Sequence, residues 1–419
     1  MQIYNLIIVG AGPAGMLAGI RAAEFCENIA ILEKNSAAGK KLAISGKGRG
    51  NLTNAGSLED LLKAFGKNGE FLRDAFKALS NKGLMDFFTS QGVALKTERG
   101  GRVFPAGDKA ESLRRALLEK LADRKVKIFY NCAVKAMGGS KKLWRITVKD
   151  SREFLAKRLI LATGGASYPV TGSDGYGLKL ARQMGHTVVA LRPGLVPLVV
   201  KEGFIAGLAG LSLKNVRVSF LQDKKHWESE VGEMLFTHFG VSGPLILEAS
   251  GNIVDWFAEG KTVGLSIDFK PGLTAEQLEQ RLLRDFKDSG GKSYKNILKE
   301  LLPQKLIKVF IRMSDIAEDK KANQISAVER QWVVRLLKDF RLTIVGARPL
   351  KEAIVTKGGV SLKDINPRTM ESRIHKGLYF CGEMIDVDAI TGGYNLQAAF
   401  STGWLAGENA ALAKAHNKG

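Results

Sequence analysis

The sequence predicts an α/β protein in which one doubly wound domain is interrupted by a second, inserted domain. A short apolar strand at 3–9 leads into a glycine-rich turn and a helical pattern, which together form the start of a βαβ unit. Two later apolar strands, within 159–165 and 378–383, also end in glycine turns, although a long stretch separates them. Near-continuous apolar strands are typical of parallel sheets, so we expect the two ends of the chain to form one domain.

The intervening residues predict the inserted domain. Residues 191–270 contain β-branched runs separated by turns, and they predict a small β-barrel or sheet. Residues 271–344 contain three runs with helical periodicity, and they predict a helical part. We therefore expect a first domain made of 1–190 and 345–419, with the insertion between its halves.

The composition is that of a globular protein with an unusual charge. Hydrophobic residues make up 45% and charged residues 25% of the chain, which is ordinary for a folded enzyme. The 63 Lys and Arg residues exceed the 42 Asp and Glu residues, so the formal net charge is +21. Such a surface favours polyanions such as nucleic acid, an anionic membrane or the ribosome. A basic surface that serves only solubility is the alternative.

Cysteine spacing and the lengths of the apolar runs argue against several other classes. Cys26, Cys132 and Cys381 form no C-x-x-C pair, which argues against a thiol–disulfide centre and a cysteine-based zinc site, and no metal is expected. No apolar run reaches the length of a membrane span, so no membrane association is expected. The chain enters a strand by Ile3, so we expect no signal peptide and a cytoplasmic protein.

The first glycine-rich turn has the form G-x-G-x-x-G between a strand and a helix, as a dinucleotide-binding turn requires. Gly10 permits the tight turn, Gly12 lets the backbone approach a pyrophosphate, and Gly15 lets the helix pack on the strand. Glu33 follows the second strand, where a carboxylate can accept both ribose hydroxyls of an adenosine and would repel a 2′-phosphate. The pattern therefore suits FAD or NAD better than NADP, and a βαβ unit without a ligand is the alternative.

The later glycine turns favour FAD over NAD. The strand within 159–165 resembles the strand beside the adenosine in two-dinucleotide-type flavoproteins, and 378–383 resembles the terminal strand whose acid meets the ribityl chain. The segment TGGYNLQ at 391–397 precedes a small-residue helix. The start of that helix would point its amides at the flavin edge, where negative charge gathers on reduction.

The loop LAISGKGRGNLTN at 42–54, which we call the cofactor loop, combines three glycines with cations and small polar residues. Such a loop can run along the pyrophosphate, the ribityl chain and the isoalloxazine in turn. Arg49 and Lys41 are then candidate partners of phosphate or of reduced flavin. A flexible surface loop is the alternative.

Six long segments, spread over nearly the whole chain, carry a family resemblance. They are GKKLAISGKGRGNLTN (39–54), GGRVFPAGDKAESL (100–113), LATGGASYPVTGSDGYG (161–177), GEMLFTHFGVSGPLIL (232–247), EAIVTKGGVSLKDI (352–365) and GLYFCGEMIDVDAITGGYNLQAAFSTG (377–403). The chain resembles the BaiN/RdsA-type family of NAD(P)/FAD-dependent flavoprotein oxidoreductases. The family loop usually reads S-G-G-G-R-C-N, whereas this chain has Lys47 in place of a glycine and Gly50 in place of the cysteine.

The resemblance implies a fold and an activity. The fold is a split Rossmann-like FAD-binding domain with an inserted β-barrel plus helical domain that covers the flavin face. The activity is that of an FAD-dependent oxidoreductase, with NAD(P)H as a donor that leaves before the substrate binds. For some members the resemblance implies dihydrouridine synthesis in large-subunit ribosomal RNA, by reduction of an electron-poor C=C bond in an unstacked uracil.

Two alternatives remain open at this point. One is a small-molecule oxidoreductase, either an ene-reductase on a steroid-like acid or an oxidase of an amino-ketone. The other is a flavoprotein without catalytic activity that assists ribosome assembly. The partner is thus ribosomal RNA, a ribosomal precursor or a small molecule.

Arg49, Lys357 and Tyr394 are the candidate catalytic residues, and Lys357 is expected in a glycine-flanked turn. Cys381 and His238 are further candidates, although packing in the core is the alternative for both. The candidate FAD-binding residues come from the fingerprint, the acid, the loop and the two later turns. They are Gly10, Ala11, Gly12, Pro13, Ala14, Gly15, Glu33, Lys34, Lys41, Ser45, Gly46, Arg49, Asn51, Thr53, Asn54, Val134, Ala162, Thr163, Gly164, Gly382, Glu383, Gly393, Asn395, Leu396 and Gln397.

The densest basic segment outside the cofactor loop is 135–158. If RNA is the substrate, we expect this segment to contact phosphates through its cations. The candidates are Lys141, Lys142, Arg145 and Arg152. A solvated hairpin face is the alternative.

Overall fold

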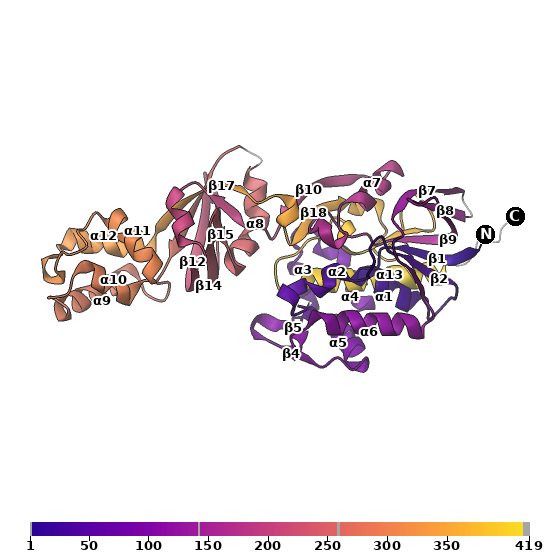
Figure 1. The fold of residues 1–419 in the computed structure, drawn as a ribbon, viewed down its shortest axis with the longest axis horizontal. Helices are drawn as coiled ribbons and strands as arrows, with labels where there is room; N and C mark the ends of the chain where they lie inside the picture. The colour runs from indigo at the N-terminus through magenta and orange to yellow at the C-terminus, as the bar shows by residue number, and fades with distance from the viewer. Residues whose placement is uncertain (1, 141–142, 258–259, 414–419) are drawn as a thin grey trace. The chain divides into compact units, whose positions relative to one another are not determined.

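The computed structural model describes residues 2–140, 143–257 and 260–413 of the chain (Figure 1). These residues form two compact units. Unit 1 comprises Met1–Gly194 and Leu350–Gly419, and unit 2 comprises Leu195–Pro349. Each unit has its own cluster of buried apolar side chains.

Within the described residues, the centre of unit 1 is a seven-stranded sheet with the order β6-β2-β1-β9-β8-β7, in which β19 also pairs with β9. Its parallel strands are β1 (Ile3–Val9), β2 (Ile29–Leu32), β6 (Lys127–Phe129), β9 (Glu153–Leu161) and β19 (Leu378–Phe380). The antiparallel strands are β7 (Val134–Ser140) and β8 (Leu143–Val148). β2 and β19 are buried along their whole length, as their unbroken apolar sequences predict.

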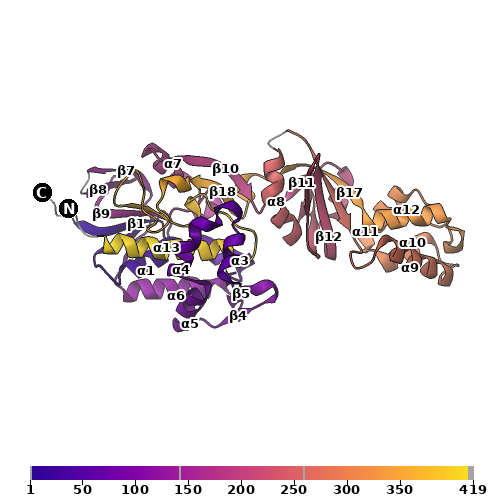
Figure 2. The same cartoon turned by 180° about the vertical axis from the view of Figure 1, so that it is seen from behind.

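Two helices of unit 1 lie against each other and border the candidate site, α1 (Pro13–Ala22) and α13 (Tyr394–Leu412) (Figures 1 and 2). α1 ends at Ala22. α13 begins at Tyr394, four residues before the predicted start, so TGGYNLQ contributes its first turn. The other helices of this unit are α2 (Lys40–Ala43), α3 (Leu58–Lys63), α4 (Arg73–Ala78), α5 (Asn81–Ser90), α6 (Ala110–Asp123) and α7 (Tyr176–Gln183).

Short strands form two smaller sheets in unit 1. β3 (Thr53–Asn54), β5 (Arg102–Pro105) and β4 (Leu95–Thr97) pair side by side in that order. β10 (Val188–Gly194) pairs with β18 (Val355–Val360). The first of these sheets includes the last two residues of the cofactor loop.

Unit 2 contains a closed antiparallel barrel. Within the described residues, the strand pairs join in a ring of six, β12-β14-β15-β11-β17-β16 and back to β12. The ring strands are β11 (Leu198–Val200), β12 (Ser212–Gln222), β14 (Gly232–Thr237), β15 (Gly240–Ser242), β16 (Val263–Asp268) and β17 (Phe340–Ala347), and β13 (Lys225–Glu228) forms a hairpin with β12. The predicted α/β class with an inserted barrel and helices is confirmed.

The helices of unit 2 are α8 (Pro244–Trp256), α9 (Ala275–Asp288), α10 (Tyr294–Leu301), α11 (Gln304–Ser314) and α12 (Ala327–Lys338). Capping boxes at Thr274 and Ser326 start α9 and α12, and both satisfy backbone N–H groups that the first helical turn leaves free. β17 begins within the range predicted as helical, because its side chains alternate between buried and partly exposed and so close the barrel. Across the described residues, no helix is long and apolar enough to cross a membrane.

Candidate functional site

The candidate site of unit 1 lies at the edge of the sheet where its parallel strands end. The turns after β1, β9 and β19 meet there, because the carboxyl ends of parallel strands lie on the same side. Gly10 has a φ of +103°, and a Cβ atom on it would lie 2.5 Å from the carbonyl oxygen of Ala162. A Cβ atom on Gly382 would lie 2.8 Å from the Cβ atom of Ala14. The structure therefore brings the three predicted glycine turns into contact.

Gly15 and Gly12 differ in the space around them. A Cβ atom on Gly15 would overlap the carbonyl oxygen of Gly10, so α1 can pack on the turn only with glycine here. Among the described atoms, none lies within 4 Å of a Cβ atom built on Gly12. Gly12 is also the N-cap of α1, and no described side chain caps that helix. Open space in front of an uncapped helix start suits a pyrophosphate.

Glu33 follows β2 and is 7% exposed. Its Oε2 accepts a hydrogen bond from the backbone N–H of Ala11 at 2.8 Å. Its Oε1 accepts from the backbone N–H and the side-chain amide of Asn35 at 2.8 and 2.7 Å. A carboxylate has about four lone-pair sites, so these described partners leave room for one ribose hydroxyl rather than the two expected.

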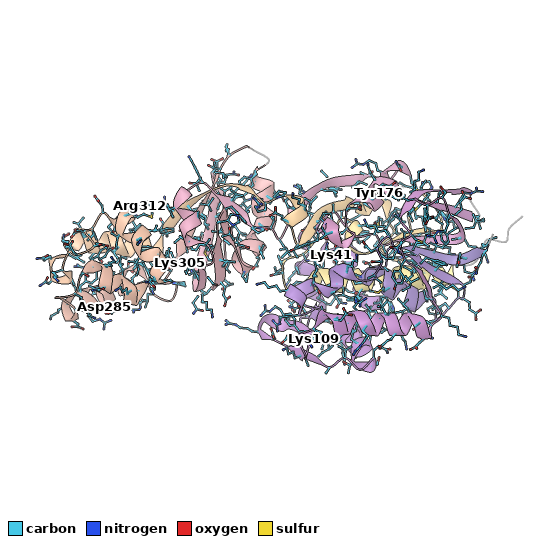
Figure 3. All side chains as sticks on the ribbon, viewed as in Figure 1. Lys41, Lys109, Tyr176, Asp285, Lys305 and Arg312 are labelled. Carbon is cyan, nitrogen blue, oxygen red and sulfur yellow. The ribbon has the colours of Figure 1, made fainter. Side chains whose placement is uncertain are left out.

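Glu383 binds residues from three other segments of unit 1 and is a clamp between them. Its Oε2 accepts from Nζ of Lys41 at 2.6 Å and from the N–H of Gly165 at 3.4 Å (Figure 3 labels Lys41). Its Oε1 accepts from the N–H of Thr356 at 2.9 Å and from the hydroxyl of Ser167 at 3.1 Å. These described donors surround the carboxylate, so Glu383 holds the turns together, and its contact with the ribityl chain stays a prediction.

The start of α13 is built on the cofactor loop. Gly393 is its N-cap with a φ of +95°, and a Cβ atom there would overlap the carbonyl oxygen of Thr53. The Thr53 hydroxyl donates to Oε1 of Gln397 at 2.5 Å, and both residues are fully buried. Gln397 in turn donates to the carbonyl of Leu79 at 3.1 Å. Thr53 and Gln397 thus support the helix start from inside the protein.

α1 and α13 run parallel and in close contact. A Cβ atom on Gly403 would overlap the carbonyl oxygen of Ala14, and one on Gly407 would overlap that of Ala18. Because Gly403 lies beside Ala14, Thr402 lies beside Pro13, the first residue of α1. α13 begins at Tyr394, which is eight residues before Thr402. At about 1.5 Å per residue, the start of α13 lies about 12 Å beyond the start of α1. The pyrophosphate and the flavin ring of FAD, which the ribityl chain joins, lie a distance of this order apart, so the two helix starts suit these two groups of one FAD.

Two of the predicted asparagines bind protein backbone. The Asn54 amide donates to the carbonyls of Gly100 at 2.9 Å and Gly392 at 3.3 Å. The Asn395 side chain accepts from the N–H of Ala389 at 2.9 Å and donates to the carbonyl of the same residue at 3.0 Å. These side chains fix the turns around the start of α13.

Asn51 differs from those two asparagines. Its Oδ1 is buried and has no hydrogen-bond partner among the described residues. A buried oxygen without a partner costs free energy unless a ligand or water supplies a donor. Ser45, at the start of the same loop, donates to the carbonyl of Leu42 at 2.7 Å. Asn51 is therefore the polar loop residue best suited to a cofactor N–H group. We call the three glycine turns, the two helix starts and the cofactor loop together the cofactor cradle, and this cradle fits FAD.

Arg49 is bound to protein carboxylates. Its Nε donates to Asp108 at 2.8 Å, its guanidinium forms an ion pair with Glu98, and its Cζ lies 4.2 Å from the centre of the Phe104 ring. Its hydrogen bond lowers the pKa of Glu98, and hydrogen bonds from Lys96 and Arg49 lower the pKa of Asp108. These partners take up the donors that the sequence interpretation assigned to phosphate or flavin.

The remaining predicted FAD contacts lie around the strand ends. Gly164 has a φ of +76°, and a Cβ atom on it would lie 2.9 Å from the hydroxyl of Ser173. Lys34 forms an ion pair of 2.7 Å with Asp174. The others are part of the turns and helix starts, namely Pro13 at the start of α1, Gly46 in the cofactor loop, Val134 at the start of β7, Thr163 after β9 and Leu396 in the first turn of α13.

The other catalytic candidates lie in different surroundings. Lys357 is in β18 opposite Arg192, not in a turn. Cys381 is fully buried, and burial raises the pKa of its thiol, which fits packing. His238 is exposed in the turn between β14 and β15 of unit 2, so the core alternative is wrong for it. Tyr394 lines a hollow of about 530 Å³ at the start of α13.

The basic hairpin was predicted to contact phosphates through four cations, and the structure describes two of them. Lys141 and Lys142 lie outside the described residues. Arg145 forms an ion pair of 3.2 Å with Glu153, and Arg152 forms one of 2.7 Å with Asp150. Paired cations release fewer counterions from RNA, so these two arginines are weaker candidates for RNA binding than the sequence indicated.

Sequence reasoning missed Ser167, Ser173 and Thr356. Ser167 and Thr356 donate hydrogen bonds to Glu383 in the clamp. The Ser173 hydroxyl is buried with no partner in the described part of the chain. Hydroxyl residues of this kind follow no fixed spacing. The available signal was their place inside the long family-like segments 161–177 and 352–365.

Comparisons with known proteins agree with this geometry. The family described as HI0933-like protein Rossmann domain matches residues 4–409. A 3-dehydro-bile acid delta(4,6)-reductase from Clostridium scindens is 36% identical over 406 residues, which cover 96% of this chain and 98% of the relative. A ribosomal RNA dihydrouridine synthase from Haemophilus influenzae is 30% identical over 409 residues, which cover 96% of this chain and 97% of the relative.

A solved structure shares the fold. The crystal structure of 3-ketosteroid-delta4-(5alpha)-dehydrogenase from Rhodococcus jostii aligns with a TM-score of 0.53 over 98% of this chain and 97% of its own. The sequences are 15% identical, so the likeness concerns the fold alone.

Proposed function

The chain belongs to the HI0933-like Rossmann-domain family and is an FAD-dependent oxidoreductase, and we propose that it reduces a C=C bond conjugated to a carbonyl group. The proposed substrate is a uridine of large-subunit ribosomal RNA, and the product is dihydrouridine. The names of both relatives describe reduction of such a bond, in a steroid-like acid and in a uracil ring. The common chemistry therefore supports the reaction, and the substrate needs a separate argument.

The observation that supports RNA as the substrate is the distribution of charge between the two units. Of the formal net charge of +21, unit 2 accounts for +4, with 23 Lys and Arg against 19 Asp and Glu, and the rest of the chain accounts for +17. Unit 1 is the unit that contains the cofactor cradle. Excess positive charge attracts the RNA backbone and raises its local concentration, whereas a small carboxylic acid gains little from so many cations.

A small-molecule enone is the second candidate substrate. The observation that favours it is the higher identity to the bile-acid reductase than to the dihydrouridine synthase. The two candidates share the cofactor and the bond that is reduced, so only substrate assays separate them.

The residues of unit 1 have separate tasks in this proposal. Bound FAD would supply hydride transfer. The amides around Gly12 would bind its pyrophosphate, and Glu33 would accept one ribose hydroxyl. The start of α13 would place its positive end at the flavin edge, and the Glu383 clamp would hold the surrounding turns. NAD(P)H is the proposed donor.

The test uses purified protein with its bound flavin. Ribosomal RNA and a 3-oxo-Δ4 steroid acid are each incubated with the protein and with NADH or NADPH, and products are identified by mass spectrometry. We expect dihydrouridine in digested RNA only when both protein and donor are present. Reduction of the steroid with unmodified RNA would transfer the proposal to the second candidate.

A further inference from the structure

The cofactor loop exposes a lysine in a backbone conformation that a side chain disfavours. Lys47 has a φ of +59°, and its neighbours Gly46 and Gly48 also have positive φ angles. A Cβ atom makes this left-handed conformation unfavourable, so glycine would suit the position better. The loop holds this residue outward in that conformation, and the exposed ammonium group of Lys47 is a candidate binding group.

Other exposed cations surround this lysine. The loop packs against β5 and the start of α6, since a Cβ atom on Gly46 would lie 3.5 Å from the Phe104 ring and one on Gly50 would lie 2.9 Å from Ala110. Arg102 lies on β5, with its Cζ 5.9 Å from the centre of the same ring. Arg99 precedes it in the β4–β5 connection, and Lys109 immediately precedes α6 (Figure 3 labels Lys109). We call the exposed side chains of Lys47, Arg99, Arg102 and Lys109 the basic ridge.

The neighbouring acids do not neutralise the basic ridge. Glu98 and Asp108 are the acids of this segment, and both are held by Arg49 and Lys96. Arg102 approaches Glu98 no closer than 3.9 Å. With two carboxylates already shared by two other cations, the ridge retains excess positive charge.

A hollow adjoins the ridge. It has a volume of about 530 Å³, and its lining includes Gly100, Gly101, Lys63, Ile390 and Tyr394. Gly100 and Gly101 are the residues between the two ridge arginines. The volume falls within the range of sites for small ligands, and an aromatic ring and an aliphatic side chain provide surfaces on which a planar base can stack.

We propose that the basic ridge binds phosphates of a single-stranded RNA segment and that the hollow receives one of its bases beside Tyr394. This inference rests on the proposed function, since it names the surface that would bring RNA to the cofactor cradle. Bases are available for stacking only where RNA is unpaired, so an unstacked loop or bulge fits better than a duplex. An anionic membrane would use the cations and leave the hollow without a role.

The test compares two sets of charge-removing variants in holoprotein. The ridge set is Lys47→Gly, Arg99→Gln, Arg102→Gln and Lys109→Gln. The control set removes four exposed cations of unit 2, Lys214→Gln, Lys224→Gln, Lys287→Gln and Lys308→Gln. The affinity for a labelled, unstructured uridine-rich oligonucleotide is measured at several salt concentrations. Each phosphate contact contributes about 0.7 to the salt slope on a single strand, so the ridge set should lower the slope by up to about 3.

The hollow is tested with Tyr394→Leu, which removes the ring. We expect weaker RNA binding and an unchanged ratio of flavin to protein. Loss of flavin from this variant would assign the hollow to the cofactor and overturn the base site. Equal effects of the ridge and control sets, or binding of phosphatidylglycerol vesicles in preference to RNA, would overturn the ridge.

The outcome is separable from that of the proposed function. Wild-type protein that forms dihydrouridine, together with a ridge set that keeps the wild-type salt slope, would refute the ridge alone. Wild-type protein that neither binds RNA nor forms dihydrouridine would refute the proposed function and the ridge with it.

Discussion

The two helix starts of the candidate site, at Gly12 and Gly393, differ in what surrounds them. The space in front of Gly12 is open among the described atoms, and no described side chain caps α1. At Gly393 a Cβ atom would overlap the backbone of Thr53, and the nearby Asn54 and Asn395 bind protein carbonyls. The first helix start is thus shaped to admit a ligand, whereas the second is held by the loops that pack against it.

The difference shows what each kind of residue reveals about a site. A fingerprint glycine is required by backbone geometry, so its place in the sequence already indicates its role. A polar side chain can bind a ligand or the backbone of a distant segment, and composition does not distinguish the two. Variants at both helix starts test this contrast.

The largest expected effects come from valine at the two glycines. Gly12→Val should fold with near wild-type stability and retain no FAD, because its side chain would fill the open space that a pyrophosphate needs. Gly393→Val should lower the free energy of unfolding by about 2–5 kcal/mol, since the positive φ and the overlap with Thr53 both disfavour a side chain. Flavin absorbance and chemical denaturation measure the two effects. A folded Gly12→Val protein with stoichiometric FAD would place the pyrophosphate elsewhere.

The clamp should give the next largest effect. Glu383→Gln presents an amide N–H₂ to the Lys41 ammonium and weakens hydrogen bonds to a charged acceptor, which are worth about 1.5–3 kcal/mol each. We expect lower stability and weaker FAD retention together, because the clamp joins turns on both sides of the cradle. Glu153→Gln is the matched control, since its ion pair with the exposed Arg145 is worth about 0–1 kcal/mol. Equal losses in the two variants would contradict the clamp.

Asn51 of the cofactor loop and Asn395 of the first turn of α13 offer a finer contrast. Asn395→Ala should cost the apoprotein about 1 kcal/mol per lost hydrogen bond and leave the flavin spectrum unchanged. Asn51→Ala should leave the apoprotein as stable as wild type or slightly more stable, because it removes a buried oxygen without a partner, and should weaken FAD binding. Unfolding curves and FAD titrations separate the two cases. Stronger FAD loss from Asn395→Ala than from Asn51→Ala would reverse their roles.

The sequence was sufficient for the fold and for the backbone part of the site. The strand before Gly10 and the acid after β2 have local signals, so the cradle could be predicted from spacing. The partners of Glu383 and Arg49 could not be predicted, because tertiary packing brings Thr356 to Glu383 and Asp108 to Arg49 from distant parts of the sequence. β17 was also missed as a strand, since its pairing partners in β11 and β16 lie far away in the sequence.

The smallest expected effect concerns pH and the acids that hold the cofactor loop. Glu98 and Asp108 have pKa values lowered by their hydrogen bonds to Arg49 and Lys96. A carboxyl group whose folded pKa is lowered stabilises the folded state above its unfolded pKa, which is about 4 for both residue types. That stabilisation is lost as the pH falls through the lowered folded value. The loop should therefore be held at neutral pH and released only below about pH 4.

Comparison with Glu98→Gln turns this into a test of how the loop is fixed. At pH 7 the variant should melt at a lower temperature than wild type, because Arg49 loses a charged partner. As the pH falls below about 4, wild-type Glu98 becomes protonated and the two melting temperatures should converge. Both acids are partly exposed, so solvent screening keeps the difference small and added salt should reduce it further. A gap that persists unchanged at low pH would mean that the glutamine perturbs packing instead of charge, and would contradict the ion pair with Glu98 as a contact that holds Arg49.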